Sequence, residues 1–177
     1  MIKYYNSFRI LSENEAKKLV RGYGQEKYFD IVSITNPSEP VDFGNHAKSI
    51  CRVEFDDEEV ESNQYKLCSK DDIAKILKYS ESVVGGNLII HCYAGVCRSS
   101  ACAFLVLLNQ TIKNPNIKYP IDIALESLIE IKSIHTIHPN RYIINLGLDM
   151  LARNIDERIK WGRELYQHEI WQHLYNT

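Results

Sequence analysis

The most restrictive feature of the sequence is the junction between a short apolar run, Leu88-Ile89-Ile90, and the segment that follows it. An apolar run without polar alternation is typical of a strand buried on both faces, as in a parallel sheet. A loop then leads into residues 99–109, which are apolar on nearly every side and therefore predict a buried helix. A buried strand that passes directly into a buried helix indicates an α/β domain built in layers.

The rest of the chain supplies further elements of the same kind. Ser12-Glu13-Asn14-Glu15 and Ser69-Lys70-Asp71-Asp72 are capping patterns that mark helix starts. β-branched residues before Asn36-Pro37 indicate a strand, and Pro120 suits the first turn of a helix. The expected strands are 29–34, 50–55 and 88–91, and the expected helices are 12–22, 69–84, 99–109, 120–133 and 139–151, the last with a continuation toward Trp171. The expected fold class is α/β, with a central, mostly parallel sheet flanked by helices.

Length and composition fit a single soluble domain over residues 1–177. Of the 177 residues, 45% are hydrophobic and 25% are charged, enough for one sizeable core. The formal charge of -2 argues against a nucleic-acid binder that depends on overall basicity. With no signal-peptide pattern and no apolar run of membrane-spanning length, we expect a cytoplasmic protein without a membrane partner. Residues 161–177 are expected to form a helical tail on the domain edge.

The cysteines do not suggest a disulfide framework, because their number is odd and their spacing is irregular. In a reducing compartment such cysteines are free, catalytic or metal-bound. A zinc site built from His91, Cys92 and Cys97 is disfavoured, since structural zinc needs four ligands and no second Cys/His pair has suitable spacing. We therefore expect no metal. Three cysteines are expected simply to pack: Cys51, Cys68 and Cys102.

The segment from Cys92 to Arg98 places a thiol, a turn of backbone N–H groups and a guanidinium around one point. Loop amides at a helix N-terminus form a nest for an anion with several oxygens. Arg98 offers a planar fork that matches two of those oxygens, which a lysine does not. Gly95 lets the backbone turn tightly and approach the ligand. The same positive field favours the thiolate of Cys92, the form that acts as a nucleophile.

Residues 91–99, His-Cys-Tyr-Ala-Gly-Val-Cys-Arg-Ser, resemble the signature loop of the protein tyrosine phosphatase superfamily, His-Cys-x5-Arg-Ser/Thr. The position of the loop in mid-chain after a strand resembles the dual-specificity branch and compact bacterial tyrosine phosphatases. Weaker similarity extends over residues 30–151, in Ile31-Val32-Ser33-Ile34, Phe55-Asp56-Asp57 and Pro139-Asn140-Arg141. The resemblance implies the fold of the cysteine-dependent phosphatases, a phosphocysteine intermediate and no cofactor.

The resemblance also implies a role for each residue of the loop. Cys92 would be the nucleophile, Arg98 the clamp on phosphate, and Ser99 a hydroxyl donor that stabilises the thiolate as leaving group. His91 would support the loop through hydrogen bonds. The backbone amides that would bind phosphate belong to Tyr93, Ala94, Gly95, Val96, Cys97 and Arg98.

A general acid must protonate the departing oxygen, and the family keeps an aspartate for this on a loop between the second strand and the helix before the signature strand. We favour Asp57, because Phe55-Asp56-Asp57 resembles the bacterial pattern in which the second polar position is Asp. Asp56 is a live alternative, and Glu58 is a remote one. Neighbouring side chains in extended chain point in opposite directions, so only one of the aspartates can face the loop. Asn140 is expected to cap a helix rather than to position a water.

Cys97 also matches the second cysteine in the loop of low-molecular-weight tyrosine phosphatases, where it can form a disulfide with the nucleophile. Under one interpretation, Cys97 is a resolving thiol that protects Cys92 from over-oxidation. Under the other, it is simply a small loop residue.

These residues predict a phosphatase, with a phosphotyrosine protein as the first expected substrate and dual specificity as a variant. The loop contains no lysine, which argues against highly charged inositol phosphates and phosphoinositides. A pseudophosphatase that captures phosphoproteins without turnover is an alternative of another class. An RNA 5′-triphosphatase is disfavoured by the acidic balance. An arsenate reductase needs a relay of cysteines, for which only Cys97 is well placed.

Overall fold

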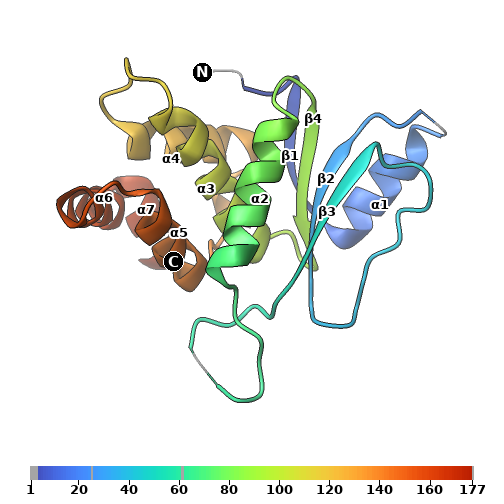
Figure 1. Cartoon of the computed structure of the whole chain (residues 1–177), viewed down its shortest axis with the longest axis horizontal. Coiled ribbons are helices and arrows are strands. Elements are labelled where there is room, and N and C mark those ends of the chain that lie inside the picture. The colour runs from blue at the N-terminus through green and yellow to red at the C-terminus, as the bar shows by residue number, and fades with distance from the viewer. Residues whose placement is uncertain (1–3, 25, 61, 177) are drawn as a thin grey trace.

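The computed structural model describes residues 4–24, 26–60 and 62–176. Its centre is a four-stranded parallel sheet with the strand order β1-β4-β2-β3. The strands are β1 (Ser7–Ser12), β2 (Asp30–Thr35), β3 (Ser49–Glu54) and β4 (Asn87–Cys92). Figure 1 shows one helix, α1 (Glu13–Gly22), on one face of the sheet and the remaining helices on the other face.

The helices of the second face form most of the domain. The longest, α3, is buried along nearly its whole length and packs on the sheet between α2 and α4. The bounds are α2 (Lys70–Ser82), α3 (Arg98–Ile112), α4 (Pro120–Ile131), a short 3-10 turn η1 (Ile134–Thr136), α5 (Arg141–Leu151), α6 (Ile155–Gln167) and α7 (Glu169–Asn176).

The two central strands are apolar because both of their faces are covered. Successive side chains of a strand point to opposite faces. In β4, Leu88 and Ile90 belong to the core beneath α3, whereas Ile89 packs with Ala16 and Val20 of α1. The prediction of a doubly covered parallel sheet with flanking helices is therefore confirmed.

The helix starts follow the capping patterns expected from the sequence. At both Ser12 and Ser69 the serine hydroxyl accepts a backbone N–H, and the acidic side chain three residues later accepts the N–H of the serine. Asn140 caps α5, and its side chain accepts the N–H of Ile143. The expected helices over 12–22, 69–84, 99–109 and 120–133 and the expected strands are confirmed to within a few residues.

Two expectations about the elements were wrong or incomplete. The last helix does not continue to Trp171: α5 ends at Leu151, and separate helices α6 and α7 follow. The break occurs because Asn154 caps a new helix, where its side chain accepts the N–H of Glu157. The edge strand β1 had not been anticipated, and it pairs with β4, about 80 residues further along the chain.

The C-terminal helices α6 and α7 pack against the main core of the domain. Trp161 of α6 and Trp171 of α7 are buried in the main core. The Trp171 ring lies edge-on to Tyr166 and tilted against Tyr175. The last turn of α7 contacts the segment before α5, where the Tyr175 hydroxyl donates to the carbonyl of Pro139.

All four strands end at the same edge of the sheet, because they are parallel. Ser12 pairs in register with Cys92, and Thr35 with Glu54. In Figure 1 this edge faces downward, and the long connection between β3 and α2 projects below it. In open parallel sheets, ligands bind outside this carboxyl edge.

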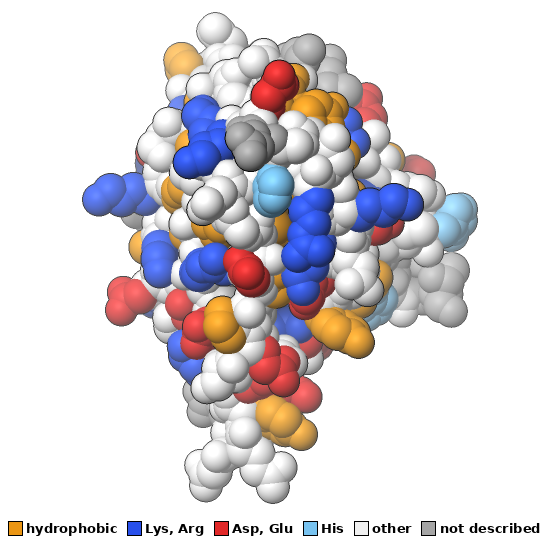
Figure 2. Space-filling model, turned by 90° about the vertical axis from the view of Figure 1, so that its right-hand side faces the viewer, with side chains coloured by type: hydrophobic (Ala, Val, Ile, Leu, Met, Phe, Trp, Pro, Cys, Tyr) orange, Lys and Arg blue, Asp and Glu red, His pale blue; other side chains and the backbone are white. Residues whose placement is uncertain are grey.

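The outer surface carries mixed charge. Figure 2 shows the side of the molecule that bears α1, where Lys and Arg side chains alternate with Asp and Glu. One such pair on α1 is Lys17 with Glu13, at 2.5 Å. Within the described ranges, no helix combines the length and the apolarity needed to cross a bilayer.

Candidate active site

Cys92 is the last residue of β4 and Arg98 is the first residue of α3, so the five residues between them form the turn from strand to helix. Both side chains are buried, with 1% of Cys92 and 4% of Arg98 exposed. The thiol and the guanidinium therefore lie inside the carboxyl edge of the sheet, at the N-terminus of a buried helix, where the helix dipole favours negative charge.

Four carbonyl groups of this loop accept hydrogen bonds from other parts of the chain. The carbonyl of Tyr93 accepts the N–H of Glu13, and that of Gly95 accepts the ammonium of Lys132 at 2.6 Å. The carbonyls of Val96 and Cys97 accept the N–H groups of His138 and Asn140, and both also accept the hydroxyl of Ser100. In a trans peptide the N–H points opposite to the C=O. The N–H groups that follow these carbonyls therefore point away from the groups that the carbonyls contact.

Gly95 makes the tight backbone turn that the sequence predicts. Its φ of +72° is in the left-handed region, and a Cβ at this position would lie 2.4 Å from the backbone nitrogen of Ser12. The missing side chain thus lets the loop pack against the end of β1. The approach of the Gly95 backbone to a ligand stays a prediction.

Arg98 is anchored on one side only. Its Nη1 donates to the carbonyl of Phe55 at 2.7 Å and to the side-chain oxygen of Asn36 at 2.9 Å. Its buried Nε has no hydrogen-bond partner within the described part of the chain. A buried donor without a partner carries a free-energy cost. An oxyanion bound in the loop would remove that cost and would match the planar fork of the guanidinium.

The hydroxyl of Ser99 lies 3.2 Å from the sulfur of Cys92, and both groups are buried. No other polar side chain has a hydrogen bond to this sulfur among the contacts of the described residues. A hydroxyl at this distance can donate to a thiolate and stabilise its charge.

His91 lies on the other face of β4 from Cys92. Its Nε2 is 2.9 Å from the hydroxyl of Ser33 in β2, and its ring is edge-on to Phe43. Burial lowers the pKa of His91 to about 4, so the ring is neutral at neutral pH. His91 therefore joins two strands just before the loop begins, from the side away from the sulfur.

The two candidate acids have different surroundings. The carboxylate of Asp57 faces the loop: Oδ2 lies 3.9 Å from the Nε of Arg98, and Oδ1 accepts the side-chain amide of Asn140 at 3.1 Å. The carboxylate of Asp56 instead accepts the backbone N–H of Lys66 at 2.8 Å, within its own connection. The two neighbouring carboxylates thus point in different directions, as expected for successive side chains in extended chain, and only that of Asp57 is near Arg98.

Cys97 lies beside this acid with a half-buried side chain. Burial, together with the nearby charge of Asp57, raises the pKa of Cys97 to about 12. The thiolate of Cys97 is therefore disfavoured at neutral pH, which makes it a weak attacking group in disulfide exchange. This setting favours the interpretation of Cys97 as a small loop residue, although its redox behaviour stays a prediction.

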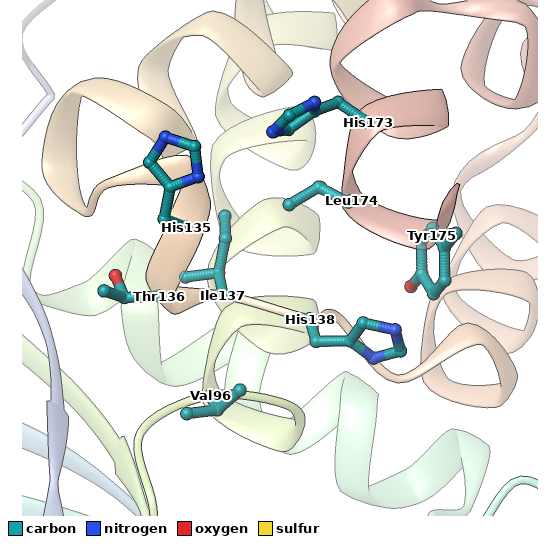
Figure 3. A pocket seen from close by; sticks show the side chains of 8 residues that line it. All are labelled: Val96, His135, Thr136, Ile137, His138, His173, Leu174 and Tyr175. Carbon is teal, nitrogen blue, oxygen red and sulfur yellow. The ribbon is translucent and has the colours of Figure 1, made fainter. Parts of the chain in front are cut away.

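A cavity of about 340 Å³ lies beside the loop, between residues 135–138 and α7. Figure 3 shows the rings of His135 and His173 next to each other at the top of the view, and Leu174 and Ile137 below them; the two ring centres are 5.5 Å apart. Only Val96 of the loop contributes to its lining. Among the described residues, no group of three or more His, Cys, Asp or Glu side chains has a geometry that could hold a metal ion.

The sequence had not identified several residues that complete the site. Asn36 and Lys132 hold Arg98 and Gly95 from distant parts of the chain, and Asn140 contacts Asp57. The Asn36-Pro37 pair had been interpreted only as the end of a strand, and Asn140 only as a helix cap or water ligand. No local pattern marks Lys132.

Comparisons with known proteins find similarity in structure rather than in sequence. No protein-family model and no curated protein matches the chain. OH1 from the Orf virus, described as a tyrosine phosphatase with triple substrate specificity, is 17% identical with a TM-score of 0.56, over 84% of each chain. The Yvh1 phosphatase domain from Chaetomium thermophilum is 19% identical with a TM-score of 0.52, over 83% of this chain and 84% of that chain.

A third solved structure, PTPMT1 in complex with PI(5)P, is 12% identical with a TM-score of 0.53, over 89% of this chain and 94% of that chain. At these identities the likeness is one of fold. The chain has the α/β fold of dual-specificity and related tyrosine phosphatases, as the resemblance of its loop implied.

Proposed function

We propose that this chain is a cysteine-dependent phosphatase that hydrolyses phosphomonoesters through a phosphocysteine on Cys92. The observation that carries the proposal is the buried guanidinium of Arg98, which is anchored through Nη1 and has no hydrogen bond at Nε among the described residues. A tetrahedral oxyanion is the ligand whose acceptors match a guanidinium and a turn of backbone N–H groups. The phosphatase fold supports the same conclusion.

In the first step, the thiolate of Cys92 attacks phosphorus and the bond from phosphorus to the leaving oxygen breaks. The loop amides and Arg98 hold the oxygens of the transferring group, whose charge they stabilise in a buried setting. Asp57 gives its proton to the leaving oxygen, which departs as an alcohol or phenol. Its carboxylate is the one that faces the loop.

In the second step, a water molecule attacks the phosphorus of the phosphocysteine. Asp57, now ionised, accepts a proton from this water, and the bond from phosphorus to sulfur breaks. The electron pair returns to sulfur as a thiolate, to which Ser99 can donate its hydroxyl across the 3.2 Å contact. Inorganic phosphate leaves, and Cys92 is ready for another cycle.

Phosphotyrosine in proteins is the substrate class that we favour, with dual specificity as the variant. The sulfur of Cys92 is almost completely buried, and the ring of phosphotyrosine carries its phosphorus farther from the peptide backbone than phosphoserine does. The side chain of Tyr93, 74% exposed on the loop, offers an aromatic surface for that ring. A phosphoinositide is the second candidate, since one structure of the same fold holds PI(5)P.

The test is turnover of p-nitrophenyl phosphate by the purified chain, followed by turnover of a phosphotyrosine peptide, a phosphoserine peptide and PI(5)P. We expect Cys92→Ser to abolish turnover, because a hydroxyl without an adjacent base is a poor nucleophile. Asp57→Asn should lower kcat by roughly 100-fold or more, the contribution of a general acid. Asp56→Asn is the matched control and should retain turnover.

The outcomes separate the rival functions. Binding of the phosphopeptide without turnover would indicate a pseudophosphatase. Faster release of phosphate from a 5′-triphosphate RNA than from either peptide would indicate an RNA 5′-triphosphatase. An equal loss in Asp56→Asn and Asp57→Asn would remove the assignment of the acid.

A further inference from the structure

Residues 138–141 connect the loop of Cys92 to the connection that carries Asp57. The N–H groups of His138 and Asn140 donate to the carbonyls of Val96 and Cys97 at 3.2 and 3.3 Å. Two residues of the same segment contact the acid's connection. The side-chain amide of Asn140 donates to the Oδ1 of Asp57 and to the carbonyl of Glu58, and the N–H of Arg141 donates to Glu59. The nucleophile's loop and the acid thus share one support.

Asn140 is the buried centre of this support, with 3% of its surface exposed. The orientation of its amide is fixed by its neighbours. As the cap of α5, its Oδ1 must accept the N–H of Ile143, at 3.1 Å. Its Nδ2 is then left to face Asp57 Oδ1 and the carbonyl of Glu58, at 3.1 and 3.3 Å, and both of these oxygens are acceptors. A flipped amide would set oxygen against oxygen and N–H against N–H.

The hydrogen bond from Asn140 gives the two carboxylate oxygens of Asp57 different surroundings. Oδ1 accepts the amide of Asn140, whereas Oδ2 lies on the side of Arg98. In the acid form, an N–H donor favours the carbonyl character of the oxygen that it contacts, so the proton resides on the other oxygen. The proton is then on Oδ2, the oxygen on the side of Arg98, which is the proposed phosphate clamp.

We propose that Asn140 is a positioning residue for the general acid: its amide holds Oδ1 of Asp57 and thereby directs the protonated Oδ2 to the leaving group. This inference rests on the proposed phosphatase function and names a residue on which its first step depends. Asn140 would then both cap α5 and position Asp57. The cap contributes to the positioning, because the hydrogen bond from the N–H of Ile143 fixes the orientation of the Asn140 amide.

The support is itself held from outside by α7. The hydroxyl of Tyr175 donates to the carbonyl of Pro139, and the guanidinium of Arg141 lies 3.8 Å from the centre of the Tyr175 ring. The ring of His138 is also against Tyr175, as Figure 3 shows. With both neighbours of Asn140 held in this way, its amide has little freedom to leave Asp57, as precise positioning requires.

Two substitutions separate the tasks of Asn140. Asn140→Ser keeps an oxygen for the cap but removes the amide donor. Asn140→Asp keeps the shape and the cap oxygen but places an acceptor against Asp57. Both variants are compared with the wild type on phenyl phosphate, whose leaving group needs protonation, and on dinitrophenyl phosphate, whose leaving group does not.

With phenyl phosphate we expect both variants to lose roughly 10- to 100-fold in kcat, the effect of one hydrogen bond to a charged group. With dinitrophenyl phosphate we expect kcat/KM, which reports the formation of the phosphocysteine, to stay within about 3-fold, because no proton is needed in that first step. In an Asp57→Asn background, Asn140→Ser should cause no further loss on phenyl phosphate, since the group that it positions is absent.

Asn154→Ser is the matched control, because Asn154 caps α6 with the same kind of contact to Glu157 and lies outside the site. It should leave both substrates unaffected. An equal loss on the two substrates, or a full additional loss in the Asp57→Asn background, would overturn the inference and leave the phosphatase function standing. Absence of turnover by the wild type would overturn both.

Discussion

Replacement of Arg98 by lysine tests the claim that a planar guanidinium, rather than a positive charge alone, binds the phosphoryl group. The Nη1 of Arg98 donates to the carbonyl of Phe55 and to Asn36, whereas its Nε has no hydrogen bond among the described residues and lies 3.9 Å from the Oδ2 of Asp57. A lysine has one nitrogen, so it cannot hold the Phe55 carbonyl and also present two parallel donors. At least one charge-assisted hydrogen bond to the substrate is lost, which costs about 1.5–3 kcal/mol.

This free energy corresponds to a fall in kcat/KM of roughly 10- to 150-fold. The assay is the initial rate with p-nitrophenyl phosphate, together with inhibition by vanadate, which should weaken in parallel. Arg52→Lys is the control, since the Nη1 of Arg52 also donates to a backbone carbonyl, that of Val41 at 2.6 Å, but in β3. If Arg98→Lys kept its rate and its vanadate affinity within about 3-fold, the two-donor clamp would be refuted.

Two further predictions concern the packing around the loop. Gly95→Ala should lower the free energy of unfolding by about 1–3 kcal/mol and reduce turnover, because its Cβ would lie 2.4 Å from Ser12 N. Gly85→Ala is the control for backbone strain alone, since Gly85 has a φ of +82° but its Cβ would meet nothing within 4 Å. Equal urea midpoints for the two variants would contradict the reasoning. Because the folded pKa of His91 is about 4 and the ordinary value is 6.5, stability is greatest above pH 6.5 and falls as the pH drops toward 4, by up to ~3 kcal/mol. Urea midpoints at several pH values should show this loss, and His91→Gln should flatten it; an unchanged slope in that variant would assign the loss to other groups.

The features that the sequence predicted correctly are those that depend on neighbours in the chain. The loop between Cys92 and Arg98 is one such feature, because the strand, the turn and the helix N-terminus are consecutive. The helix caps at Ser12, Ser69 and Asn140 are others, since each needs only a donor three residues away. The cap at Asn154, which separates α6 from α5, has the same local form and was overlooked.

The features that the sequence did not predict depend on residues far apart. β1 has only one buried residue, Ile10, and its pairing with β4 arises from the tertiary fold. The contacts of Asn36 with Arg98 and of Lys132 with Gly95 join segments 62 and 37 residues apart. The choice between Asp56 and Asp57 is of the same kind, because it depends on the direction in which the connection after β3 leaves the sheet.

The most direct test of the proposed mechanism is to trap the phosphoryl group on sulfur. In an Asp57→Asn variant, dinitrophenyl phosphate should still phosphorylate Cys92, while attack by water is slow without the base. After a denaturing quench and digestion, mass spectrometry should find one phosphoryl group on the peptide that contains Cys92. A phosphoryl group on another residue, or hydrolysis that persists in Cys92→Ser, would contradict the mechanism.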